Sequence, residues 1–274
     1  MSVRTNIAAM MSAGQLGRTN KSLTSSLAKI SSGFRINSAA DDAAGLGVGT
    51  NLETQVVSTR QAMRNINDGI SIIQTAEGAA HEVTDILQRM RELAVQSSSG
   101  TLANSERSFI VDEFDQLREE VARIAAVTEF NGVQLADGSE TAGIDVQVGI
   151  NNNSTADRIN ITLGDLTTQT LDIDGIDLST SGTAQTALAT LDTALGSVNS
   201  FRSDFGAVQN RLESALNNSQ VYVEALSSAQ SSIMDTDFAT ETSNLTKLQI
   251  MQQAGVASLA QAKNINQSVI SLLS

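Results

Sequence analysis

The chain has no cysteine, proline or tryptophan, and its 274 residues include one histidine and one tyrosine. Without cysteine there is no disulfide, no thiolate nucleophile and no cysteine-bound zinc. A single histidine excludes a metal site with several histidine ligands. Aromatic residues make up 3% of the chain, so it supplies little of the buried aromatic area on which compact enzyme cores depend. These absences disfavour most classes of enzyme.

Basic residues and long apolar runs are also scarce. The chain has 17 Lys and Arg against 30 Asp and Glu, a net charge of −13, which argues against a nucleic-acid partner. The longest early apolar run, residues 7–11, is shorter than the roughly 7–15 residues of a signal-peptide core. No run approaches the roughly 18 apolar residues of a membrane span. We therefore expect a soluble protein without a Sec-type signal and without membrane insertion.

Apolar residues recur at alternating intervals of four and three near both ends of the chain. The N-terminal seam consists of Ala9, Ala13, Leu16, Asn20, Leu23, Leu27, Ile30 and Phe34. The C-terminal seam consists of Leu248, Met251, Gly255, Leu259, Ala262, Ile265, Val269 and Leu272. This spacing is the a/d pattern of a coiled coil, and so narrow an apolar stripe requires another helix as its partner. The pattern predicts that the two ends of the chain pair.

Three longer helical patterns lie between the two seams. The first covers about residues 50–97, and Gly45, Gly47 and Gly49 weaken any earlier start because glycine disfavours helix. Asn104 or Ser105 is positioned to cap the second helix, since both residue types favour that position. The last long helix covers about residues 184–230.

The stretch at about 140–180 has a different period. Apolar residues alternate with polar residues or glycine over 144–150 and again over 159–163, which is the pattern of a β-hairpin. Residues 171–178 are expected to continue this β region. The whole pattern predicts a mainly α protein, an elongated helical rod or coiled coil with a small β-hairpin region.

Three short motifs resemble parts of known chemical sites. The segment from His81 to Asp85 resembles a zinc-protease helix but lacks the second histidine that such a site needs. The glycines of 45–49 lack the third glycine and the preceding strand of a dinucleotide site. Asp41 and Asp42 are explained by the positive end of a helix dipole. We expect no catalytic residue, no cofactor and no bound metal.

Several long motifs resemble bacterial flagellin. They are the N-terminal run at 27–45, the runs at 67–71, 88–96 and 128–132, and the C-terminal runs at 249–255, 259–262 and 271–273. The resemblance covers about residues 1–135 and 185–274. It implies a terminal coiled-coil domain of residues 1–44 plus 232–274 in the inner layer of a filament, and a rod domain of residues 45–231 with three long helices. The short middle of the chain implies that the outer domains of larger members are absent.

The resemblance also implies a function and partners. The expected function is a structural subunit that self-assembles into the flagellar filament outside the cell. The partners would be further copies of the chain, an export chaperone and the flagellar export apparatus, and the hook-associated and cap proteins. The alternatives are a hook–filament junction protein of the same family and, from a different class, an enzyme carried on a filament.

Two sets of residues follow from this reading. The larger members of the two seams are expected to drive polymerisation: Leu16, Leu23, Leu27, Ile30, Phe34, Leu248, Met251, Leu259, Ile265, Val269 and Leu272. In the family, the animal Toll-like receptor for flagellin reads an Arg and a Leu of the first long helix and a Glu of the second. By the resemblance these residues are Arg89, Leu93 and Glu113.

Overall fold

The computed structural model describes residues 5–140 and 142–271, with side-chain surroundings as far as residue 264. Its elements are α1 (Ile7–Ser32), α2 (Ala43–Ser97), α3 (Asn104–Val127), β1 (Glu129–Phe130), β2 (Val133–Gln134), β3 (Ile144–Gln147), β4 (Arg158–Ile161), α4 (Ser181–Met234) and α5 (Phe238–Ser271). The mainly helical fold with a small β region is confirmed. Contacts divide the chain into two compact units, one joining the residues up to Val56 with those from Glu224 onward, the other Val57–Val223.

The helix α1 ends earlier than the predicted seam. Asn6 caps its start by accepting a hydrogen bond from the Ala9 N–H at 2.9 Å, and Gly33 ends it with φ of 78°. Glycine adopts this left-handed conformation without strain. Phe34, the last predicted seam residue, therefore lies beyond the helix, where it forms an isolated antiparallel bridge with Asp235.

The helix α2 begins at Ala43, earlier than expected. Asp42 caps it, because its carboxylate accepts a hydrogen bond from the Gly45 N–H at 2.9 Å. A Cβ atom added at Gly49 would collide with the side chain of Met234, at the end of α4. Close packing against Met234 thus requires glycine here, and the helix tolerates the loss of propensity. The prediction of a later start was wrong because it considered propensity alone.

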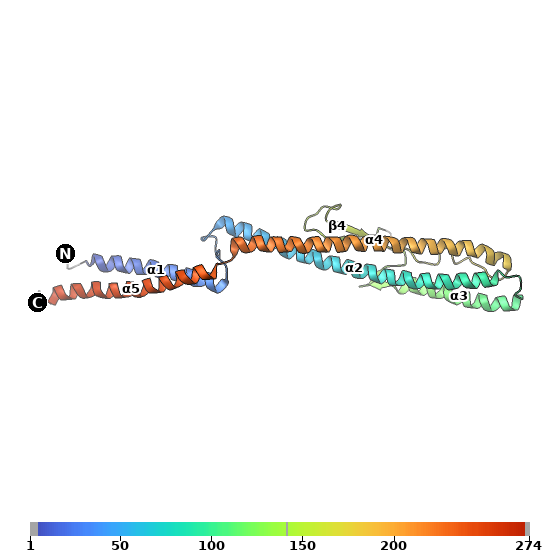
Figure 1. Cartoon of the computed structure of the whole chain (residues 1–274), viewed down its shortest axis with the longest axis horizontal. Helices are drawn as coiled ribbons and strands as arrows, with labels where there is room; N and C mark the ends of the chain where they lie inside the picture. The colour runs from blue at the N-terminus through green and yellow to red at the C-terminus, as the bar shows by residue number, and fades with distance from the viewer. Residues whose placement is uncertain (1–4, 141, 272–274) are drawn as a thin grey trace. The chain divides into compact units, whose positions relative to one another are not determined.

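The long helices of the Val57–Val223 unit run side by side around a common core (Figure 1). The buried stripe of α2 repeats at intervals of three and four and consists of Ile66, Gly69, Ile73, Ala76, Ala80, Val83, Leu87, Met90 and Ala94. Phe114 and Val121 of α3, and Leu191 and Leu212 of α4, complete the core. The buried face of α2 thus follows the period of a helix.

The β region consists of two short antiparallel pairs. β1 and β2 are joined by Asn131 and Gly132, both with positive φ, as a type I′ hairpin requires. β3 pairs with β4 so that Val146 lies opposite Ile159, and both are buried. A Cβ atom at Gly69 would lie 2.9 Å from a methyl group of Val146, so this glycine lets β3 approach α2.

The expected continuation of β structure over 171–178 was wrong. This described segment consists of turns, with Asp172 at φ of 57°. Its apolar residues Leu171, Ile173 and Leu178 are nevertheless buried in the core. The apolar residues of this segment therefore report burial rather than pairing between strands.

Candidate functional site

The two terminal helices, α1 and α5, pack against each other, each through one face. On α1, Leu16, Leu23 and Ile30 are half-buried. The positions between them are taken by Thr19 and Ser26, which are buried. Leu27 lies exposed on the helix, and Phe34 lies exposed beyond its end. Small hydroxyl side chains fill the inner positions, so part of the predicted apolar seam of α1 remains on the surface of the single chain.

The matching face of α5 has the same mixed character. Leu248 and Leu259 are half-buried, whereas Met251 is exposed and Gln252 takes the inner position beside it. A Cβ atom at Gly255 would lie 3.3 Å from a methyl group of Leu16, so Leu16 packs over this glycine. Among the remaining predicted seam residues, the side chains of Ile265 and Val269 lie beyond the described side chains, and Leu272 lies outside the described residues.

Polar contacts define the register of α1 against α5. The Asn6 side-chain amide donates to the carbonyl oxygen of Ala262 at 2.8 Å, and Gln252 donates to the side-chain oxygen of Asn20 at 2.8 Å. The Ser26 hydroxyl donates to the carboxylate of Glu241. A shift of one helix along the other would break all three bonds. Asn20, the single polar member of the predicted N-terminal seam, is thus one of the register contacts.

Large apolar side chains remain uncovered on this unit. They are Ile7, Met10, Met11, Leu27, Phe34, Val48, Phe238, Ile250, Met251 and Val256. Scattered exposed apolar residues are ordinary, but a concentration along two paired helices is typical of a surface that binds a further protein. The terminal helices therefore bury only part of their apolar surface against each other, and the remainder is available for contacts with a further protein.

The predicted receptor residues lie at the α2–α3 contact. The Arg89 guanidinium donates to one carboxylate oxygen of Glu113 at 3.0 and 2.7 Å, and to Glu92 at 2.9 Å. The hydrogen bonds with Glu113, then that with Glu92, raise the pKa of Arg89. Arg89 and Glu113 are about half exposed, whereas Leu93 is 1% exposed and belongs to the core. Only the charged pair is thus presented at the surface.

A second arginine fastens α2 to α4. Arg91 donates to the two carboxylate oxygens of Asp192 at 2.6 and 3.4 Å. The hydrogen bond with Arg91 lowers the pKa of Asp192. Sequence reasoning did not single out this pair, because the two residues are 101 positions apart and charged helix residues are usually solvated.

The three short motifs have structural roles. His81 lies 3.3 Å from Asp85, and both are well exposed on α2. Gly45–Gly49 are helical, and Asp41 accepts hydrogen bonds from the Asn37 and Ser38 N–H groups. The hydrogen bond with the Ser38 hydroxyl is the main cause of the lowered pKa of Asp41. Within residues 5–140 and 142–271, no three His, Cys, Asp or Glu side chains are grouped to hold a metal.

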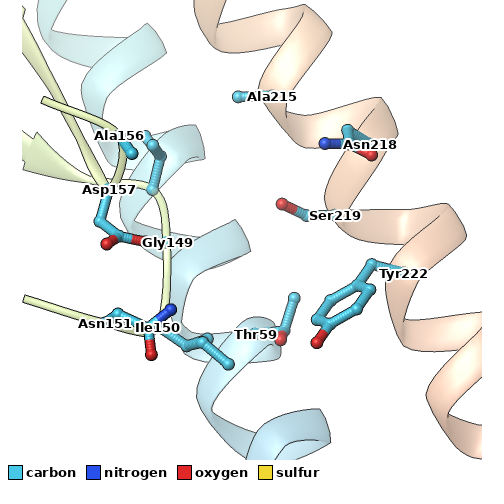
Figure 2. Close-up of a pocket in the computed structure, with 11 residues that line it drawn as sticks. Thr59, Gly149, Ile150, Asn151, Ala156, Asp157, Ala215, Asn218, Ser219 and Tyr222 are labelled. Atoms are coloured by element: carbon cyan, nitrogen blue, oxygen red, sulfur yellow. The ribbon is translucent and has the colours of Figure 1, made fainter. Parts of the chain in front are cut away.

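A groove of about 370 Å³ lies between the loop after β3 and the helices α2 and α4. Figure 2 shows Thr59 of α2, Ile150 of the loop and Tyr222 of α4 around it. We call it the hairpin groove. The sequence pattern indicated a loop here but carried no sign of a groove, because its walls come from three distant segments.

Hydrogen bonds within the loop support the wall of the hairpin groove. The carbonyl oxygen of Asp157 accepts from the Val148 and Gly149 N–H groups at 2.8 and 3.1 Å. The Asp157 carboxylate accepts from the Asn153 N–H at 3.1 Å. A Cβ atom at Gly149 would collide with this carboxylate. The loop is therefore closely packed and bonded, which suits a preformed binding surface.

Comparisons with known proteins agree with this architecture. The bacterial flagellin N-terminal helical region matches residues 3–141, and the bacterial flagellin C-terminal helical region matches residues 188–273. A flagellin of Halalkalibacterium halodurans is 41% identical over 273 residues, covering 100% of both chains. The flagellar filament 30.7 kDa core protein of Treponema maltophilum is 39% identical over 288 residues, also covering 100% of both.

Solved structures show the same relationship. The crystal structure of Bacillus cereus flagellin has 32% identity and a TM-score of 0.51, and the match covers 57% of this chain and 88% of that one. A structure described as a flagellar hook-associated protein from Vibrio parahaemolyticus has a TM-score of 0.55 and covers 71% of this chain and 100% of that one. At 15% identity, the second likeness shows the fold alone.

Long helices with paired ends, and relatives that build filaments, define a structural subunit that associates with its own copies. The chain belongs to the bacterial flagellin family, and it is a subunit of the flagellar filament. The resemblance inferred from its motifs is confirmed. Nothing in the matches favours the alternative of a hook–filament junction protein. No helix of the described residues is long and apolar enough to cross a membrane.

Proposed function

We propose that the chain polymerises through its terminal helices, outside the cell, and that its role is structural rather than catalytic. The observation that carries this proposal is the mixed seam between α1 and α5. Its inner positions are partly polar, and apolar residues such as Leu27, Phe34 and Met251 stay exposed. Isolated helices gain stability chiefly from packing, so contact with further copies supplies what one chain leaves incomplete. The layers proposed for the filament are residues 1–44 plus 232–274 inside and 45–231 around them.

Truncation tests the role of the ends. Chains lacking residues 1–35 or 240–274 should fail to extend filament seeds, because each loses one partner of the seam. Circular dichroism should still show helix from the Val57–Val223 unit, whose core lies entirely within it. Growth of normal filaments from either truncated chain would contradict the proposal.

The proposed route to the filament is the export apparatus of the flagellum, without cleavage of a signal. A chaperone would cover apolar side chains of the C-terminal helix such as Leu248 and Met251, because exposed seams associate prematurely. Hook-associated and cap proteins would then contact the subunit at the ends of the filament. Mass spectrometry of secreted protein should show no loss beyond Met1, and removal of 15 or more N-terminal residues would overturn this route.

Recognition by the animal Toll-like receptor for flagellin is proposed for the surface around Arg89 and Glu113, with Leu93 beneath it. The pair joins α2 to α3 at about half exposure, and arginine is frequent among residues that dominate binding energy. Since Leu93 is 1% exposed, we expect it to act by holding this surface in shape.

A receptor reporter assay on monomer tests this surface. Arg89→Ala should weaken signalling while circular dichroism stays unchanged. Arg123→Ala is the matched control, because Arg123 is an exposed arginine paired with Glu120 on α3. Equal signalling by the two variants would refute the assignment.

A further inference from the structure

The methionines of this chain differ widely in their exposure. The chain has seven of them, and the structure describes all except Met1. In the Val57–Val223 unit, Met90 is fully buried and Met63 is half-buried. The exposed methionines among the described residues all belong to the unit that joins the two chain ends: Met10 (66% exposed), Met11 (72%) and Met251 (38%).

Met10 and Met11 lie on the face of α1 that is turned away from α5. Leu16 packs over Gly255 of α5, and it is separated from Met10 by about 120° and from Met11 by about 140° around the helix. Ile7, which is 64% exposed, precedes the two methionines by three and four residues and so shares their face. We call these three side chains the outer patch of α1. It is apolar, and α5 does not cover it.

Met251 lies at the margin of the contact between α5 and α1. The next residue, Gln252, donates a hydrogen bond to the side-chain oxygen of Asn20 on α1 at 2.8 Å. Gln252 is thereby turned toward α1, and Met251 keeps 38% of its surface exposed. All three methionine side chains are therefore within reach of small solutes in the free chain.

Peroxides oxidise exposed methionine to methionine sulfoxide. One oxygen of hydrogen peroxide passes to the thioether sulfur, so that the O–O bond breaks as the S–O bond forms. The sulfur loses two electrons, and the peroxide is reduced to one water molecule, which keeps both protons. Exposure governs which methionines react, so Met10, Met11 and Met251 should react well before the buried Met90.

A sulfoxide at these positions changes the surface that is proposed to join copies of the chain. The methionine thioether is apolar and adapts to irregular surfaces. The sulfoxide is polar and disrupts methionine-rich contacts, because burying its oxygen without a hydrogen bond costs free energy. Met10 and Met11 supply two of the three side chains of the outer patch of α1, so their oxidation makes most of that patch polar.

We propose that Met10, Met11 and Met251 form a sulfoxidation site, through which a peroxide prevents the free chain from adding to a filament. This inference rests on the proposed self-assembly through the terminal helices. The modification is reversible, because methionine sulfoxide reductases act on each of the two sulfoxide epimers. In that reaction a dithiol is oxidised to a disulfide, the S–O bond breaks, and the oxygen leaves as water. The buried methionine of the long-helix core, Met90, takes no part.

Peroxide treatment of the full wild-type chain tests the site. Folded monomer is treated with hydrogen peroxide, the excess is removed, and peptide mass spectrometry locates the added oxygen atoms. Met10, Met11 and Met251 should carry one oxygen each, and Met90 none. The monomer concentration at which seeded growth stops should rise at least about tenfold, as expected for the loss of one buried apolar side chain. Treatment with a dithiol and the two reductases should restore the original concentration.

Leucine variants assign the effect to these sulfur atoms, because leucine has nearly the volume of methionine and no sulfur to oxidise. The quantity compared is the ratio of the treated to the untreated stopping concentration of each variant. For the chain with Met10→Leu, Met11→Leu and Met251→Leu this ratio should stay close to one. The matched control, Met63→Leu with Met234→Leu, removes two half-buried methionines and should keep the ratio of wild type. Circular dichroism establishes that the treated chains are folded.

Intact filaments provide a further measurement that needs no variant. Assembled copies should cover the outer patch of α1, so Met10 and Met11 should be oxidised at least about tenfold more slowly in filaments than in monomer. That factor corresponds to the cost of uncovering one apolar side chain.

The outcomes separate this site from the proposed function. If untreated wild-type chain fails to extend seeds, self-assembly itself is wrong. If wild-type chain carrying the three sulfoxides grows like untreated chain, or if the triple leucine variant loses growth as wild type does, filament formation stands and the sulfoxidation site is refuted. Oxidation of Met10 and Met11 at equal rates in filament and monomer, or a loss of growth that the reductases fail to reverse, would refute it as well.

Discussion

Replacing Arg107 should destabilise the chain more than replacing any exposed arginine. Arg107 is buried where α3 begins against the end of α2. Its guanidinium donates to the carbonyl oxygen of Ser97 at 3.0 Å, to that of Ser99 at 2.6 Å, and to the side-chain oxygen of Asn104 at 3.2 Å. The positive charge thus satisfies carbonyl groups at the C-terminus of α2, where the helix dipole is negative.

The magnitude follows from these bonds. A hydrogen bond to a charged group contributes about 1.5–3 kcal/mol, and part of the sum is offset by the cost of burying the guanidinium. For Arg107→Met, which keeps most of the apolar stem, we expect a loss of about 2–4 kcal/mol in the free energy of unfolding.

Urea unfolding followed by circular dichroism measures this loss. Arg123→Met is the matched control, because Arg123 lies on the same helix but is exposed, and it should unfold at nearly the wild-type midpoint. Arg107→Lys should fall between the two, since lysine retains the charge but not the planar fork. If Arg107→Met unfolded like Arg123→Met, the reasoning about the end of α2 would be wrong.

Four further substitutions test the packing and electrostatics. Gly78→Ala should stabilise α2 by about 1 kcal/mol, because nothing lies within 4 Å of the added Cβ. Gly69→Ala should destabilise the chain, because its Cβ would press against Val146. Thermal unfolding distinguishes the two variants. Leu93→Ala should cost about 2–5 kcal/mol in urea unfolding, and a neutral result would contradict its burial. Arg91 lowers the pKa of Asp192 in the folded chain. The pair therefore stabilises the folded chain at pH values above the pKa of an unfolded aspartate, about 3.9. This stabilisation is lost as the pH falls through the lower pKa that Asp192 has in the folded chain. Asp192→Asn should therefore lower the unfolding midpoint at pH 7 and match wild type well below pH 3 (about one unit under the unfolded pKa); equal midpoints at pH 7 would count against the pair.

Periodicity predicted the helices because the same residues that repeat along the chain are the ones buried. The stripe of α2 from Ile66 to Ala94 is an example, since its three-and-four spacing places one face against α3 and α4. The turn at Asn131 and Gly132 was likewise predictable, because few other residues adopt positive φ there. The motifs of the two ends predicted the family and the filament, which no periodicity could provide.

Features that depend on distant contacts escaped prediction. On α1, Thr19 and Ser26 are buried while Leu27 is exposed, and Ser26 bonds to Glu241 of α5, a contact that the sequence does not reveal. The close packing of Gly49 against Met234 joins two residues that are far apart in the sequence. The burial of Arg107 was not predictable, because the sequence does not distinguish a buried arginine from a solvated one.

Seeded growth of the purified full chain tests the central claim most directly. Sonicated filament fragments are mixed with monomer, and filament length is measured by electron microscopy as the monomer is consumed. We expect fragments to lengthen in proportion to the monomer added, with the wild-type chain alone and no other protein present. Seeds that keep their length while the monomer stays folded and soluble would contradict the assignment of this chain as a self-assembling filament subunit.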